Sequence, residues 1–116
     1  MNLEIHKELL DFIDRKDFSS VQQSLENLNP ADISNVLIRF NEEEICQILS
    51  ALDANISSEI ILELPEDIRT KILKVLDNKS ILNVVEELES DDATDLISEL
   101  DEKKSKEILE NMNPQD

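Results

Sequence analysis

Residues 64–88 read LPEDIRTKILKVLDNKSILNVVEEL and contain one pattern twice. Each copy opens on a leucine followed by a residue that favours a turn or a helix start, first Pro65 and then Asp77. Eight residues after the leucine stands an apolar pair, Ile72-Leu73 and then Val84-Val85, and a further leucine closes each unit. On a helix, the pair and the closing leucine share one face. Each copy therefore predicts a turn of about three residues followed by a helix of about nine.

The pattern extends to both sides with a period of twelve residues. Each unit is bounded by a large apolar residue, and the boundaries are Leu28, Phe40, Leu52, Leu64, Leu76, Leu88, Leu100 and Met112. The next position usually holds a helix-capping or turn residue: Asn29, Asn41, Asp53, Pro65, Asp77, Glu89, Asp101 and Asn113. The apolar pairs are Val36-Leu37, Ile48-Leu49, Ile60-Ile61, Ile72-Leu73, Val84-Val85, Leu96-Ile97 and Ile108-Leu109. Helices this short are marginal alone, so their stripes must pack against neighbouring units.

We therefore expect an all-α superhelix of about nine short helices within a single domain, residues 1–116. Residues 1–27 predict a capping pair, with one helix over 3–13 and a second over about 18–28 that starts at Asp17 or Ser19. Seven repeats fill 28–112, and 113–116 begin another that does not continue, which predicts a piece of a longer protein. A continuous coiled coil is the competing interpretation, but turn residues every twelve positions interrupt it.

The composition argues against several functions. The chain has no glycine, which phosphate-binding loops and dinucleotide fingerprints require. The single histidine, His6, and the single cysteine, Cys46, provide neither a catalytic triad nor a zinc site, and we expect Cys46 to be a buried apolar residue. The net charge of −17 disfavours binding to nucleic acid or to an anionic lipid surface. No apolar run is long enough to cross a bilayer.

The acidic residues concentrate in the segment from Glu86 to Glu102, which contains no lysine or arginine. On a helix, Asp91, Asp92, Asp95 and Glu99 fall within about 100° of one another, opposite the apolar side chains. Glu59 and Glu63 form a similar pair one turn apart. Surface carboxylates can bind magnesium, which keeps several of its waters, but a solvated helix face has the same pattern. From the residues alone, the solvated face is the favoured interpretation.

Three segments resemble a known family, the N-terminal cytoplasmic domain of MgtE-type magnesium transporters. They are Asn29-Pro30-Ala31-Asp32-Ile33, Leu64-Pro65-Glu66-Asp67 and the run from Leu88 to Leu96. Asn29 departs from the family, which usually has histidine there. The resemblance implies a regulatory domain on the cytoplasmic side of the cell membrane, followed by CBS (cystathionine-β-synthase) domains and a homodimeric pore.

In such transporters, the acidic domain docks on the CBS domains of its own polypeptide when Mg²⁺ is plentiful, and bridging ions favour the closed pore. The resemblance implies Asp91 and Asp95 as the first choices for metal ligands, with Glu59 and Asp92 as further candidates. It assigns no catalytic residues. The membrane would be reached only through a C-terminal region that this sequence lacks.

A protein-docking scaffold similar to the flagellar motor switch protein FliG is the alternative function. Such a chain is expected to have glycine-bearing loops and a charged helix with basic residues, whereas this sequence lacks the glycines and has an acid-only strip. An enzyme is a more distant alternative, because no nucleophile and base are paired.

Overall fold

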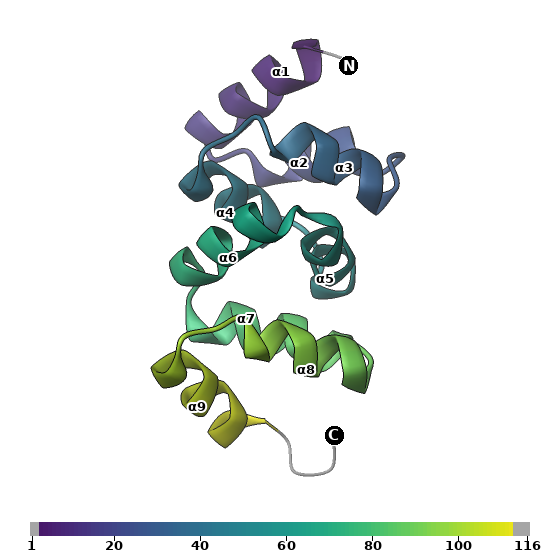
Figure 1. Cartoon of the computed structure of the whole chain (residues 1–116). Helices are drawn as coiled ribbons and strands as arrows, with labels where there is room; N and C mark the ends of the chain where they lie inside the picture. Colours follow the sequence, from purple (N-terminus) through teal and green to yellow (C-terminus); the bar gives the residue numbers. More distant parts are fainter. Residues whose placement is uncertain (1–2, 113–116) are drawn as a thin grey trace.

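The computed structural model describes residues 3–112, and every regular element in that range is an α-helix (Figure 1). The nine helices of these residues are α1 (Leu3–Asp14), α2 (Phe18–Leu25), α3 (Pro30–Leu37), α4 (Glu42–Ser50), α5 (Ala54–Glu63), α6 (Glu66–Val75), α7 (Asn78–Glu87), α8 (Ser90–Ser98) and α9 (Glu102–Asn111). The prediction of an all-α repeat fold of about nine helices is confirmed. The start of the further repeat predicted at 113–116 lies outside the described residues.

The helices begin where the capping pattern predicts. Asn29, Asn41, Asp77 and Asp101 each accept a hydrogen bond from the backbone N–H three residues on. Such bonds satisfy one of the orphan donors of a helix N-terminus. Of the two caps considered for α2, the chain uses Asp17, whose side chain accepts from the Ser20 N–H. The short connections between helices are thus specified locally by the sequence.

Most helices from α3 onward pack mainly on the helix two places along the chain. The pairs are α3 with α5, α4 with α6, α5 with α7, and α7 with α9, whereas α8 packs on its chain neighbours α7 and α9. Figure 1 shows the result as stacked layers between the two ends of the chain, and the molecule measures 42 × 25 × 24 Å. Helix α1 packs on α2 and α4 at the first end.

The core follows the apolar stripe until the last repeats. The first residue of all seven apolar pairs is buried, from Val36 to Ile108. The second residue is buried in five pairs, but Ile97 is only partly buried and Leu109 is 55% exposed. The expectation that Leu109 belongs to the packed stripe is therefore wrong, because no described helix lies beyond α9 to cover it.

The helices of this chain end without the glycine that commonly terminates a helix. Glycine commonly ends helices in a left-handed conformation that satisfies the last carbonyls. Here α5, α6 and α7 end instead on leucines in extended conformation, Leu64, Leu76 and Leu88. Basic side chains from other helices donate hydrogen bonds to the last carbonyls, which have no partner within their own helix. Arg69 donates to the Leu64 carbonyl at 2.9 Å, and Lys104 Nζ donates to the carbonyls of Leu73, Lys74 and Leu76 at 2.8–3.0 Å.

Cys46 and His6, whose side chains are of types that can act in catalysis, both pack against other parts of the fold. Cys46 is buried, and its pKa is raised to about 11, chiefly by desolvation and further by the Glu42 charge. Its thiol is therefore protonated at neutral pH and packs as a small apolar group, as predicted. The His6 ring lies 4.4 Å from the Phe40 ring, centroid to centroid. Among the described helices, none has both the length and the apolar character needed to span a membrane.

Candidate metal site on helix α8

Helix α8 begins with a cluster of carboxylates. Glu89 is the N-cap residue, with extended backbone angles (φ −67°, ψ 158°), and its side chain makes no capping hydrogen bond. Asp91 and Asp92 follow in the first turn of the helix. Carboxylates are stabilised at this end of a helix by its free N–H groups and its dipole. The first turn of α8 therefore accommodates three acids despite their mutual repulsion.

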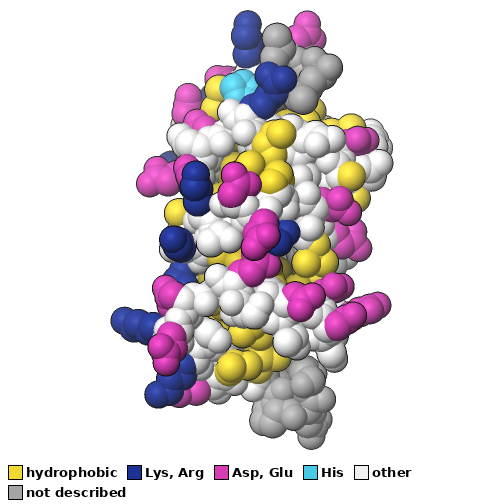
Figure 2. All heavy atoms as spheres, in the orientation of Figure 1, with side chains coloured by type: hydrophobic (Ala, Val, Ile, Leu, Met, Phe, Trp, Pro, Cys, Tyr) yellow, Lys and Arg dark blue, Asp and Glu magenta, His cyan; other side chains and the backbone are white. Residues whose placement is uncertain are grey.

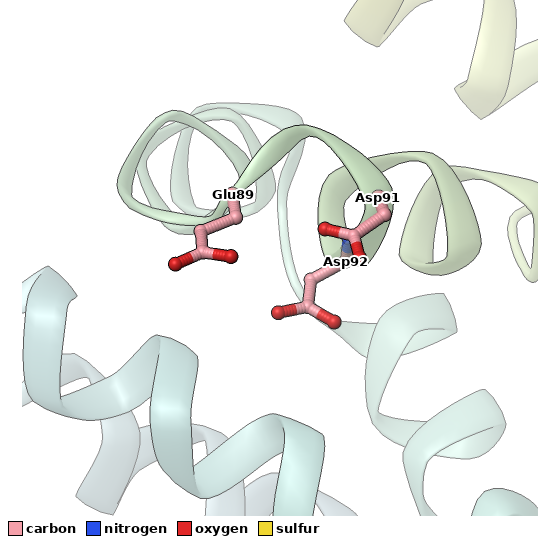
Figure 3. A group of neighbouring side chains, drawn as sticks. All are labelled: Glu89, Asp91 and Asp92. Atoms are coloured by element: carbon pink, nitrogen blue, oxygen red, sulfur yellow. The ribbon is translucent and has the colours of Figure 1, made fainter.

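The three carboxyl groups lie close together. Each of Glu89, Asp91 and Asp92 offers an oxygen, and these oxygens all lie within 4.8 Å of one another. Figure 3 shows the carboxyl groups of Glu89 and Asp92 on the same side of the helix, with that of Asp91 adjacent. Asp91 also accepts the Asp92 backbone N–H at 3.1 Å. We refer to these three residues as the α8 acidic group.

The structure adds Glu89 to the residues that sequence reasoning selected. The helical projection began inside α8, so it treated the preceding position only as a turn residue. The sequence does mark Glu89 as unusual, because it occupies the capping position of its repeat, where Asp and Asn form side-chain caps in other units. The longer glutamate makes no such bond here. Its carboxylate is therefore exposed and takes no part in the helix cap.

The other predicted ligands lie apart from this group. Asp95 is exposed one turn further along α8 and does not belong to the set of carboxylates within 4.8 Å. Glu59 is exposed on α5, where it lines a shallow depression with Glu63 and the turn from Asn29 to Ala31. The assignment of Glu59, Asp91, Asp92 and Asp95 to metal binding remains a prediction.

Glu99 does not join the outward acidic strip, and that expectation is wrong. Both of its carboxylate oxygens accept from Arg69 Nε, at 2.9 and 3.0 Å. The side chains of Arg69 and Glu99 are only 17% and 18% exposed. The projection located Glu99 correctly around the helix but ignored the neighbouring layer, where α6 supplies a cation. Glu99 is therefore committed to an ion pair between α6 and the end of α8.

The basic residues of the described helices are confined to four of them. Lysine and arginine occur in α1, α6, α7 and α9, whereas α2, α3, α4, α5 and α8 contain neither. On the face shown in Figure 2, basic side chains lie mainly at the top and left edge, whereas acidic side chains lie along both edges and across the middle. The α8 acidic group thus stands on a helix that has no cation of its own.

The donor set suits magnesium better than softer metals. It consists only of carboxylate oxygens at a surface, and the described residues place neither the histidine nor the cysteine in it. Mg²⁺ prefers oxygen ligands, takes one or two carboxylates directly and retains several waters. Zinc would favour nitrogen and sulfur donors. The α8 acidic group can therefore supply part of a Mg²⁺ shell.

Comparison with protein families identifies the chain. Residues 28–116 match the model of the MgtE intracellular N domain, which covers more than half of the sequence. The chain belongs to this family. The resemblance drawn from the three sequence segments is confirmed, and this MgtE N domain is associated with magnesium transport. Its family is one of transporter domains and is not a known enzyme family. A search of curated proteins found no match.

Proposed function

We propose that this MgtE N domain senses cytoplasmic Mg²⁺ and regulates the pore of its transporter. At high Mg²⁺, the domain docks on the CBS domains of the same polypeptide through bridging ions, and the closed pore is favoured. In this proposal, residues 1–27 cap the repeats of 28–112, and the complete transporter is a homodimer. The observation that carries the proposal is the α8 acidic group on a helix without lysine or arginine.

The proposed mechanism depends on the difference in Mg²⁺ affinity between the docked and the free domain. The α8 acidic group offers only part of a coordination shell, and a second acidic surface would contribute the remaining carboxylates through bridging waters. Without Mg²⁺, two such surfaces repel each other. A shift from 1:99 to 99:1 requires about 5.5 kcal/mol of differential binding. Several ions must act together, and Asp95 and Glu59 would bind further ions.

The test is a double substitution, Asp91→Ala with Asp95→Ala, in the intact transporter that carries this domain. The measurement is protease protection of the linker after the domain as a function of Mg²⁺ concentration. We expect the protection curve to move to higher Mg²⁺ and the pore to stay open where the parent closes. The control is Glu86→Ala with Glu87→Ala, which removes the same charge from two exposed residues of α7.

Two further variants distinguish which carboxylates bind the ion. If the α8 acidic group is the primary site, Glu89→Gln shifts the protection curve further than Asp95→Asn does, although each removes one charge. The opposite order would assign the ion to the pair of Asp91 and Asp95. Equal curves for the double variant, its control and the parent, with the fold intact by circular dichroism, would contradict the proposal.

A further inference from the structure

A groove with both apolar and acidic lining opens between two layers of the stack, apart from the α8 acidic group. It lies where the turn between α2 and α3 meets the start of α5, and its volume is about 340 Å³. Six apolar residues line it, Leu25, Leu28, Pro30, Ile33, Leu52 and Ile56. We call this feature the Ile56 groove. Its volume falls at the lower end of the range of ligand-binding pockets.

The walls of the groove are fixed by the fold. Gln22 of α2, which lines the groove, donates from Nε2 to the Ala51 carbonyl at the end of α4. This bond ties the two sides together, and α3 packs directly on α5. The groove is therefore present before any partner binds, so binding does not have to order its walls.

Ile56 exposes apolar surface in this groove. Ile56 is 38% exposed as a residue, although most large aliphatic residues of the described chain are buried. Leu28 and Leu52 beside it are only partly buried. Exposed apolar surface in a concave site is typical of a contact that a partner completes. A bare cation or a polar metabolite would gain nothing from these side chains.

The rim of the groove is acidic and has no basic counterpart. Glu26, Asp53 and Glu59 line it, and no lysine or arginine of residues 3–112 does. Asp53 caps α5 by position but makes no side-chain capping bond, so its carboxylate is not used by the helix. From Lys16 to Arg69, the only basic residue between them is Arg39. The groove therefore favours a partner with positive charge on both sides of an apolar anchor.

We propose that the Ile56 groove binds a basic amphipathic polypeptide segment. The segment inserts one or two large aliphatic side chains between Leu28, Leu52 and Ile56. Its lysine or arginine side chains pair with Glu26, Asp53 and Glu59 at the rim. A short helix with apolar anchors three or four residues apart presents this combination. Of the carboxylates proposed for Mg²⁺, only Glu59 borders the groove, so this binding does not depend on the magnesium proposal.

The probe is a defined leucine–lysine peptide, LKKLLKLLKKLLKL, labelled with fluorescein. Its binding to the domain is followed by fluorescence anisotropy in the presence of EDTA, so that divalent ions play no part. A peptide with every leucine replaced by glutamine keeps the charge and removes the apolar face. We expect the leucine peptide to bind. The glutamine peptide should bind at least about tenfold more weakly, as for loss of a central apolar anchor.

Two matched pairs of domain variants locate the contact. Ile56→Gln should weaken binding of the leucine peptide about tenfold, whereas Val75→Gln should leave it unchanged. Val75 is the appropriate control because it is also a large exposed aliphatic side chain, at 47%, but lies on α6 beside Lys71 and Lys74. For the rim, Glu26→Gln with Asp53→Asn should weaken binding at low salt, and the charge-matched pair Glu86→Gln with Glu87→Gln should not.

Amide chemical shifts give an independent check that needs no variant. On titration with the leucine peptide, the perturbed amides should cluster in residues 22–33 and 51–59. The proposal is overturned if the glutamine peptide binds as well as the leucine peptide, because attraction to the net charge would then explain binding. It is equally overturned if the perturbed amides lie elsewhere, or if Ile56→Gln and Val75→Gln bind alike.

Discussion

Replacing Arg69 by methionine tests the connection between α6 and α8. The side chain serves two structural purposes: Nε donates to both oxygens of Glu99, and the guanidinium also donates to the Leu64 carbonyl. Methionine retains most of the apolar packing and loses every donor. The substitution therefore removes the ion pair and the helix cap together while the volume changes little.

The expected loss of stability follows from the burial of the pair. Exposed ion pairs contribute about 0–1 kcal/mol, and breaking a buried one costs about 3–5 kcal/mol. With side chains 17% and 18% exposed, this pair lies between those limits, at about 2 kcal/mol. The lost carbonyl cap adds about 1 kcal/mol. We expect Arg69→Met to lower the free energy of unfolding by about 3 kcal/mol, or the Tm by about 12 °C.

Urea denaturation followed by far-UV circular dichroism is the suitable assay, since the chain has no tryptophan or tyrosine to report by fluorescence. Lys71→Met is the control, because Lys71 is an exposed cation of the same helix and its loss changes the net charge equally. Its effect should stay below about 0.5 kcal/mol. A double-mutant cycle with Glu99→Gln should give a coupling energy of about 1–2 kcal/mol. If Arg69→Met is no worse than Lys71→Met, the ion pair and the cap do not stabilise the fold.

Two further predictions concern the repeat itself. Ile72→Ala should lower the free energy of unfolding, measured by urea denaturation, by about 2–5 kcal/mol because Ile72 is fully buried. Leu109→Ala should lower it by less than about 0.5 kcal/mol, and equal losses would contradict the assignment of the apolar stripe. At the start of α7, the hydroxyl and N–H of Ser80 lower the pKa of Asp77 below 3.8. Because the folded-state pKa is depressed, the stabilisation by Asp77 is present above its ordinary pKa of 3.8 and is lost as the pH falls through the folded-state pKa. The difference in unfolding free energy between the parent and Asp77→Ala should therefore shrink as the pH is lowered through this range, and a constant difference would contradict the prediction.

The sequence predicted most of what is local in this fold. Capping by Asn29, Asn41 and Asp77 depends on residues three positions apart, so the helix starts could be read directly. The buried face of each helix in the repeat could be predicted because an apolar residue, such as Ile60 or Ile72, recurs every twelve positions. Both features depend on short-range geometry that the backbone imposes whatever the rest of the chain does.

The features that the sequence did not predict depend on neighbouring layers. Glu99 has the same helical phase as the exposed acids, and only the position of α6 places Arg69 beside it. Lys104 appears in the sequence as one of several lysines of α9, yet its Nζ caps the end of α6. Similarly, the closeness of Glu89 to Asp91 and Asp92 results from the extended backbone before α8. These relations require the three-dimensional arrangement of the helices.

The stacking of most helices on the one two places along has a consequence for how the chain folds. The side-chain hydrogen bonds between such layers join residues 26 to 31 positions apart, as in the bonds from Cys46 to Ile72 and from Lys104 to Leu73. The unfolded chain thus has to close only loops of about thirty residues to form any one layer. Most contacts of the described residues are closer still in sequence, and proteins rich in such local contacts fold rapidly. Folding can begin at any layer and spread in both directions, without first bringing the two ends of the chain together.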